Sequence, residues 1–248
     1  MEVRIAETED ELGEMAARDI AVALREKLQE QEHVRIVFAA APSQSAMLAS
    51  LLREPGIEWP RVTAFHMDEY LGLPREAPQL FGSWLTREFF SRVALENVHL
   101  IDPQGEPEAV CQAYGSLLKE APIDLVLLGI GINGHVAFND PPADLHDPVP
   151  VRVVTLDEAC RMQQVMDGCF ADLEGVPRHA ITLTVPMLMA GEALFCCVPG
   201  LHKSQAVKQM LQASVSGDCP ATALRLHPHC TVYLDRESSS LSVEYARG

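Results

Sequence analysis

The sequence has far fewer basic than acidic side chains, and the basic residues do not cluster. Its 248 residues include 19 Lys and Arg against 35 Asp and Glu, which gives a net charge of −16 at pH 7. Recognition of the phosphate backbone of nucleic acid depends on basic patches, so we expect no nucleic-acid partner. A small anionic ligand is compatible with this composition, because a few local cations and helix N-termini are enough to bind one.

Long apolar runs and paired cysteines are also missing. No apolar run approaches the roughly 18 residues of a membrane-spanning helix. The acidic stretch 1–11 lacks the apolar core of a signal peptide. The seven cysteines include no C-x-x-C pair, and Cys196 and Cys197 lie next to each other in an apolar run that is typical of a buried strand. These features predict a protein of the reducing cytoplasm that makes no membrane contact.

No Pro- or Gly-rich linker, internal repeat or low-complexity stretch divides the chain, so we predict one domain over residues 1–248. Hydrophobic residues make up 48 % and charged residues 22 %, which is ordinary for a globular protein. Short β-rich runs alternate with helical patterns along the whole chain. We expect strands at 34–39, 62–66, 98–101, 123–128, 151–154, 180–184, 193–198 and 231–234, and helices at 8–29, 45–52, 83–90, 106–120, 157–166 and 203–211.

This alternation predicts an α/β fold. Strands separated by helices of this length form right-handed crossovers, and such crossovers build a mostly parallel sheet. We therefore expect a single-domain, doubly wound, Rossmann-like sheet with helices on both faces. The Pro-rich stretch 141–148 reads as a surface loop or lid.

The stretch 129–141, Gly-Ile-Gly-Ile-Asn-Gly-His-Val-Ala-Phe-Asn-Asp-Pro, directly follows a predicted strand. It spells the G-x-G-x-x-G of a dinucleotide loop, but that loop needs a helix that opens at its last glycine. Two prolines and an asparagine after Gly134 oppose such a helix. The turn instead brings His135 and Asp140 to the end of a strand, where open α/β sheets bind ligands. His135 could also be a hydrogen-bonded structural histidine.

A second group lies in the stretch 64–74, where Asp68 and Glu69 follow the predicted strand 62–66. An isolated acidic pair usually caps or solvates a strand end. Together with His135, however, the chain offers a carboxylate and an imidazole from two strand ends. That pair is the minimum needed for proton transfer at a sugar carbon and a sugar oxygen. The histidines 66, 146, 227 and 229 match no metal-ligand spacing, so we predict no metal site.

Both stretches resemble the glucosamine-6-phosphate deaminase (isomerase) family, whose superfamily also holds the 6-phosphogluconolactonases. Members show F-N-M-D-E-Y-x-G-L-P and G-x-G-x-D-G-H-x-A-F-N-E-P, and this chain has Phe-His-Met-Asp-Glu-Tyr-Leu-Gly-Leu-Pro at 65–74 and the run at 129–141. Stretches 176–184, 199–203 and 226–228 also look like family landmarks, so the resemblance spans nearly the whole chain. Tyr70 and Phe138 resemble the deaminase branch.

The resemblance implies conversion of an amino-sugar 6-phosphate to a ketose 6-phosphate and ammonia, with no metal or organic cofactor. Asp68 is then the base that moves a proton between C2 and C1, and His135 assists ring opening. Asn133 and Asp140 support that histidine, and Lys203 holds the phosphate. The residues expected to bind substrate are Ser43, Gln44, Ser45, Glu69, Gly134, Lys203, Arg161 and Arg225. Among them, Ser43 and Ser45 offer hydroxyls at a helix start, and Arg161 and Arg225 are reserve cations for the phosphate. Without the family context, Lys203 reads equally well as a solvated helix residue, and the segment around Arg225 as a connecting loop.

The chain departs from the family pattern at the residues that support His135 and at those that bind the phosphate. Asn133 replaces an Asp, and a neutral amide adds no charge to stabilise an imidazolium. Asp140 replaces a Glu, which draws the carboxylate back by one methylene. The phosphate loop reads Ala-Ala-Ala-Pro-Ser-Gln-Ser at 39–45 in place of T-G-G-T-P, and Met166 stands near the position of a phosphate-binding Arg, with Arg161 in the same helix. A divergent member with altered substrate choice is the expectation.

Two alternatives stay open. One is hydrolysis of a 6-phosphosugar lactone, in which His135 activates water, although Tyr70 and the Ala-Phe-Asn-Asp run count against it. The other is a sugar-phosphate binding protein with weakened catalysis, for which Asn133 is the best indication. In all three cases the expected partner is a small sugar phosphate, and the resemblance is compatible with a homo-oligomer.

Overall fold

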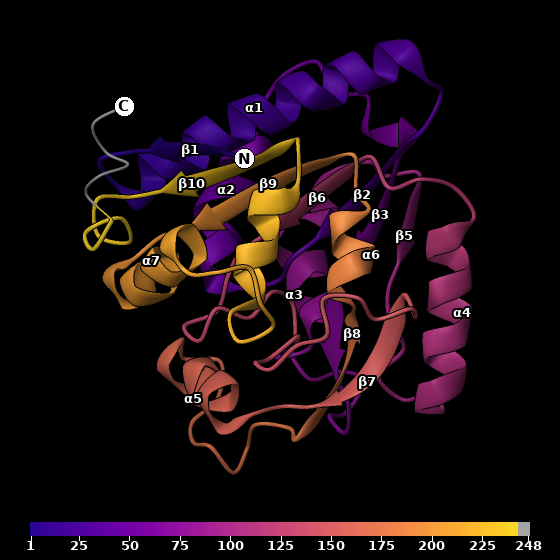
Figure 1. Ribbon diagram of the computed structural model, residues 1–248. Helices are drawn as coiled ribbons and strands as arrows, with labels where there is room; N and C mark the ends of the chain where they lie inside the picture. The colour runs from indigo at the N-terminus through magenta and orange to yellow at the C-terminus, as the bar shows by residue number, and fades with distance from the viewer. Residues whose placement is uncertain (243–248) are drawn as a thin grey trace.

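A computed structural model describes residues 1–242 and contains a seven-stranded sheet at its centre (Figure 1). All neighbouring strands in this sheet pair in parallel, in the order β1-β10-β9-β6-β2-β3-β5. This arrangement confirms the predicted mostly parallel sheet. Its strands are β1 (Glu2–Ile5), β2 (Val34–Phe38), β3 (Val62–His66), β5 (Asn97–His99), β6 (Leu125–Leu128), β9 (Ala193–Val198) and β10 (Cys230–Leu234).

Helices cover both faces of the sheet. Successive side chains of each strand point to opposite sides, so the apolar strands present an apolar surface on each face for helices to pack against. Cys197 of β9 belongs to the apolar cluster under one set of helices, and its neighbour Cys196 belongs to the cluster under the other set. Both cysteines are buried and unpaired, as the sequence predicts. The first face carries α1 (Glu9–Glu30), α2 (Ser45–Leu51) and α3 (Phe81–Glu88), and the second carries α4 (Pro107–Lys119), α6 (Val185–Met189) and α7 (Ser204–Gln212).

A second sheet differs from the sequence expectation. It has three antiparallel strands in the order β4-β8-β7 (Asp68–Tyr70, His179–Leu183 and Val151–Thr155). Strands β7 and β8 lie in the lower half of Figure 1, as does α5 (Glu158–Met166). The predicted strands near 151 and 180 exist, but they pair with each other and with β4. Sequence patterns give the strands but not their partners, which depend on the chain reversal between β7 and β8.

The site is set by the order in which the chain builds the large sheet. From β2 the chain continues to β3 and β5 on one side, whereas β6 lies on the other side of β2 and leads towards β9 and β10. The loops that leave β2 and β6 therefore diverge and open a crevice at the carboxyl edge, which is where open α/β sheets bind ligands.

Most element boundaries agree with the sequence prediction to within a few residues. The stretch 141–148 is a loop, and the last six residues of the predicted domain, 243–248, lie outside the described part of the chain. Within residues 1–242, no helix combines the length and apolarity needed to cross a membrane.

Helix α1 touches α2 so closely that a side chain at one position has no room. A Cβ added at Gly13 would lie 2.6 Å from the carbonyl carbon of Ala46. We expect Gly13→Val to force the two helices apart and to lower the free energy of unfolding by about 2–3 kcal/mol, the usual cost of overpacking. Glu14→Val, at the exposed neighbouring position, introduces the same side chain without the clash. Valine has a higher helix propensity than glycine, so propensity cannot account for a loss of stability in Gly13→Val. Urea denaturation of both variants measures the difference, and equal stabilities would contradict this packing.

Candidate active site

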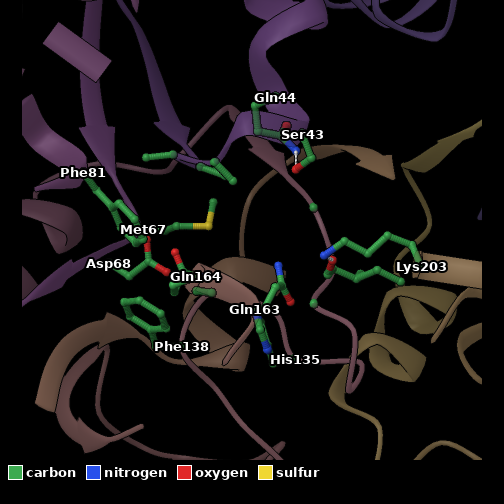
Figure 2. Close-up of a pocket in the computed structure, with 17 residues that line it drawn as sticks. Ser43, Gln44, Met67, Asp68, Phe81, His135, Phe138, Gln163, Gln164 and Lys203 are labelled. Carbon is green, nitrogen blue, oxygen red and sulfur yellow. Dashed lines mark hydrogen bonds between the residues drawn. The ribbon is translucent and has the colours of Figure 1, made fainter. Parts of the chain in front are cut away.

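The crevice holds a cavity of about 480 Å³, counted with its opening to solvent, that is lined by the loops after β2, β3, β6 and β9 and by α5 (Figure 2). It brings together five of the residues predicted from the sequence. These are Ser43, Gln44, Asp68, His135 and Lys203. Met67, Phe81 and Phe138 supply apolar walls.

The Asp68 carboxylate lies at the junction of the two sheets, at the first residue of β4 and two residues beyond the end of β3. The side chain is buried, and its oxygens accept no hydrogen bond from any residue in 1–242. Burial, together with the charge of the adjacent Glu69, raises the pKa of Asp68 well above its usual range. A carboxylate without protein partners, facing a cavity, is a strong base once it is deprotonated.

Glu69 points away from Asp68, as alternate residues of a strand must. Its carboxylate accepts backbone N–H groups of Phe81 and Gly82, at 2.9 and 2.8 Å, and so caps the start of α3. Burial raises the pKa of Glu69 to about 7, although these bonds act to lower it. The side chain lines a different cavity, so the structure does not bring this predicted binding residue to the site.

His135 rests on the glycine turn that follows β6. Its ring lies so close to Gly131 that a Cβ there would be 2.0 Å from the ring, so only glycine fits. The Gly131 N–H also donates to the His135 carbonyl at 2.9 Å. Gly134, at φ +82°, reverses the chain between them. Gly134 therefore shapes the turn and does not line the cavity. No helix begins at Gly134, which excludes a dinucleotide-binding loop here.

Asn133 orients the histidine through both ends of its amide. Its Nδ2 donates to the carboxylates of Asp140 and Asp157, at 3.2 and 3.1 Å, so its Oδ1 must be the atom that faces His135. That oxygen accepts the His135 backbone N–H at 3.1 Å and lies 2.7 Å from Nδ1. Nδ1 therefore carries a proton, and Nε2 is left as the nitrogen that can exchange a proton with a ligand.

Asp140 supplies the charge that Asn133 lacks. Its Oδ1 lies 3.3 Å from His135 Nδ1, and its Oδ2 accepts the backbone N–H of Asp157 at 3.1 Å. Burial acts to raise the pKa of Asp140, but the hydrogen bond and charge of His135 outweigh it and lower the pKa. The shorter carboxylate thus still reaches the imidazole, and the cation that forms during proton transfer has an anionic neighbour.

Lys203 provides a cation at the opposite end of the cavity from Asp68 (Figure 2). It is 2 % exposed, its Nζ donates to the Ile130 carbonyl at 2.9 Å, and burial lowers its pKa to about 8. Ser43 and Gln44 stand beside it on the loop after β2. The Gln44 Nε2 donates to the Cys197 carbonyl at 3.2 Å and to Ser43 Oγ at 3.3 Å. The Ser43 hydroxyl proton stays free, so this end can bind an anion with the charge of Lys203 and the Ser43 hydroxyl.

Three further predicted residues lie away from the cavity. Ser45 is exposed at the start of α2. Arg161 is buried and donates to the Leu173 and Val176 carbonyls, and Arg225 donates to the Leu211 and Ala213 carbonyls at the end of α7. Both guanidinium groups hold loops in place. Met166, near the expected position of a phosphate-binding Arg, is exposed on α5.

Two glutamines of α5 are part of the site and were missed by the sequence reasoning. The Gln163 Oε1 accepts the Ile132 N–H at 3.0 Å and ties the glycine turn to the helix. Gln164 is buried, lines the cavity, and points into it near Asp68 in Figure 2. Its amide makes no hydrogen bond within residues 1–242, which leaves a donor and an acceptor for a ligand. A polar residue on a helix carries no sequence signal of this kind, because its direction depends on how the helix packs.

Comparison with known proteins agrees with this geometry. A family model described as glucosamine-6-phosphate isomerases/6-phosphogluconolactonase matches residues 7–233. The chain is 32 % identical over 247 residues to a glucosamine-6-phosphate deaminase of Bacillus cereus strain B4264, covering 98 % of this chain and 90 % of the relative. A glucosamine-6-phosphate deaminase of Bacillus thuringiensis strain Al Hakam is 31 % identical over the same coverage.

Solved structures give the same result. A monomeric glucosamine-6-phosphate deaminase superposes with a TM-score of 0.88 and 28 % identity, covering 97 % of this chain and all of that one. A 6-phosphogluconolactonase from Thermotoga maritima has a TM-score of 0.75 at 20 % identity, over 94 % and 98 % of the two chains, and shares the fold. The chain belongs to the glucosamine-6-phosphate isomerase/6-phosphogluconolactonase family.

Proposed function

We propose that this protein is a sugar-phosphate isomerase/deaminase that converts an amino-sugar 6-phosphate, glucosamine 6-phosphate or a close analogue, to a ketose 6-phosphate and ammonia. The observation that carries the proposal is the unpartnered Asp68 carboxylate, which shares one cavity with the imidazole of His135. The curated relatives named as deaminases support this reading over lactone hydrolysis.

Ring opening is the step assigned to His135. Its Nδ1–H is held by Asn133, so Nε2 is the nitrogen that takes the proton of the anomeric hydroxyl and returns it to the ring oxygen as the C1–O bond of the ring breaks. Asp140, 3.3 Å from Nδ1, stabilises the transient imidazolium. The product of this step is the open-chain aldehyde.

Asp68 then moves a proton along the opened chain. Its carboxylate removes the proton on C2, next to the aldehyde, and the C1 oxygen takes a proton from the C2 ammonium, which gives an enolamine. Asp68 then returns its proton to C1, and an iminium forms at C2. Water adds to that carbon, and ammonia leaves as the ketone forms. A desolvated carboxylate suits this task because its pKa is raised towards that of the carbon acid.

Lys203 and Ser43 would hold the phosphate at the other end of the cavity, and Gln44 would position Ser43 by donating to its Oγ. One buried cation and a hydroxyl replace the arginine and the glycine loop of the deaminase pattern. These residues support a mode of phosphate binding that differs from the deaminase pattern. The proposal includes a cytoplasmic location and a small-molecule partner, in line with the unpaired cysteines of the described residues and the acidic composition.

The direct test is ammonia release and ketose 6-phosphate formation from glucosamine 6-phosphate. We expect Asp68→Asn to lower kcat by about 10³-fold, within the range of general acid–base catalysis. Its stability should be equal to that of the wild type or higher at pH 8, because the substitution removes a desolvated charge. Asp144→Asn, at an exposed position outside the cavity, is the matched control. Full activity of Asp68→Asn, or rapid turnover of 6-phosphogluconolactone in place of the amino sugar, would contradict the proposal.

The pH profile gives a second test. Activity requires deprotonated Asp68, so kcat should fall as the pH decreases through its raised pKa. The negative charge of Glu69 contributes to that raised value. We therefore expect Glu69→Gln to shift the acid limb of kcat to lower pH, whereas Asp144→Asn leaves it in place. An acid limb that stays unchanged in Glu69→Gln would contradict the assignment of this limb to an Asp68 carboxyl whose pKa the charge of Glu69 helps to raise.

Substitution of Gln164 provides a third test of the proposed function. We expect Gln164→Ala to lower kcat/KM by about 10- to 100-fold, which corresponds to one or two lost hydrogen bonds of about 1–1.5 kcal/mol each. Met162→Ala, on the more exposed side of the same helix, should leave kcat/KM within twofold of the wild type. Steady-state kinetics of the two variants measures this, and equal values for both would show that Gln164 makes no contact with the sugar.

A further inference from the structure

Three side chains with different metal-binding atoms meet behind the cavity. His135 comes from the glycine turn, Asp140 from the loop after it, and Cys160 from the first turn of α5. One nitrogen, one carboxylate oxygen and the thiol sulfur all lie within 4.8 Å of one another. His135 Nδ1 and Asp140 Oδ1 are already 3.3 Å apart, which is close to the spacing of two ligands on one tetrahedral zinc ion.

The surroundings of this cluster favour a cation. Asp157, which caps α5 by accepting the Cys160 N–H, brings a second carboxylate to the Asn133 amide next to the three ligands. Within residues 1–242, no Lys or Arg side chain makes a hydrogen bond or ion pair with any of these groups. The three donors are nearly or fully buried, and burial together with the charges of Asp140 and Asp157 raises the pKa of the Cys160 thiol.

A cation can reach Asp140 through a second cavity, without entering the substrate cavity. Asp140 lines a second cavity of about 630 Å³, counted with its opening to solvent, whose wall also includes Asp144 and Asp147. His135 lines the first cavity and is absent from the lining of this one. Asp147 is paired with Arg152 in the same wall, so Asp144 and Asp140 are the carboxylates that attract a cation here.

We propose that His135, Asp140 and Cys160 form a binding site for a thiophilic divalent cation, of the Zn²⁺ or Cd²⁺ type, and that its occupation switches the enzyme off. Imidazole nitrogen, thiolate sulfur and carboxylate oxygen are the ligands that such ions take, whereas Mg²⁺ and Ca²⁺ prefer oxygen alone. On binding, a metal–sulfur bond forms and the Cys160 proton passes to solvent. The Nδ1 proton of His135 moves to Nε2 as Nδ1 becomes a ligand.

This exchange removes the groups on which ring opening depends. With the metal on Nδ1 and a proton on Nε2, the imidazole has no lone pair for the sugar, and the Asp140 carboxylate no longer faces an Nδ1–H. The loss of activity rests on the proposed function, whereas metal binding itself does not. Cys160 takes no part in the proposed reaction, so it offers a substitution that separates the two.

The test titrates the purified full-length chain with Cd²⁺, and follows the ultraviolet charge-transfer absorption of a cadmium–thiolate bond. We expect about one equivalent to bind in the wild type and in Cys169→Ser, a control at a half-buried cysteine near α5. Cys160→Ser and Cys160→Ala should bind at least 100-fold more weakly. Thermal unfolding in the absence of metal identifies the Cys160 variant that keeps the wild-type fold, and that variant is used for the comparison.

Activity supplies the second readout. Zn²⁺ should inhibit ammonia release by the wild type and by Cys169→Ser, while the folded Cys160 variant keeps its basal activity and needs at least 100-fold more Zn²⁺ for the same inhibition. Mg²⁺ should have no effect. Absence of the cadmium band from the wild type, or an equal band in the Cys160 variant, overturns the proposal. Because the band requires no turnover, a protein that binds Cd²⁺ but does not deaminate would contradict only the proposed reaction.

Discussion

The site depends on a carboxylate that is buried without a protein partner. Asp68 is the first residue of β4 in the small sheet and follows closely after β3 of the large one, so the fold takes it out of water at the point where the two sheets meet. Burying an unpaired acidic group costs stability, and no backbone N–H or basic side chain of the described part of the chain offsets that cost by bonding to the Asp68 carboxylate. The same desolvation raises the pKa of Asp68 and makes it a base for a carbon-bound proton.

Glu69 shows the opposite use of an equally buried acid. It bonds to the N-terminus of α3 and so fixes Phe81, which forms part of the cavity wall. Two adjacent carboxylates thus have two tasks, one structural and one free for a ligand, because strand geometry turns them to opposite sides. The charge of the structural carboxylate also raises the pKa of the free one.

The support of His135 explains how the chain tolerates its departures from the family pattern. With Asn133 in place of an Asp, the amide binds two carboxylates with its Nδ2 and the histidine with its Oδ1. Asp140 approaches Nδ1 directly. The negative charge is therefore retained near the imidazole and comes from a different side chain. Packing of the ring against Gly131 helps to fix its position.

The sequence was sufficient to predict the parallel sheet, most helices and the residues that meet at the crevice, because periodicity and glycine turns are local signals. It could not predict that β4, β7 and β8 form their own sheet, since strand pairing is not local. Arg161 and Arg225 were predicted as phosphate ligands from their charge, but both satisfy backbone carbonyls. Ser45 was predicted as part of the loop after β2, but it is the first residue of α2 and its side chain is exposed to solvent. Gln164 could be found only once the packing of α5 was known.

The most direct test of a shielded base at Asp68 is the fate of the C2 hydrogen. Glucosamine 6-phosphate carrying deuterium at C2 is converted by the wild-type enzyme in ordinary water, and the ketose 6-phosphate is analysed by NMR after brief reaction. Because a buried carboxylate exchanges its proton slowly with solvent, part of the label should appear at C1. A product that has no deuterium at C1 at any stage would contradict a single buried base that carries the proton from C2 to C1.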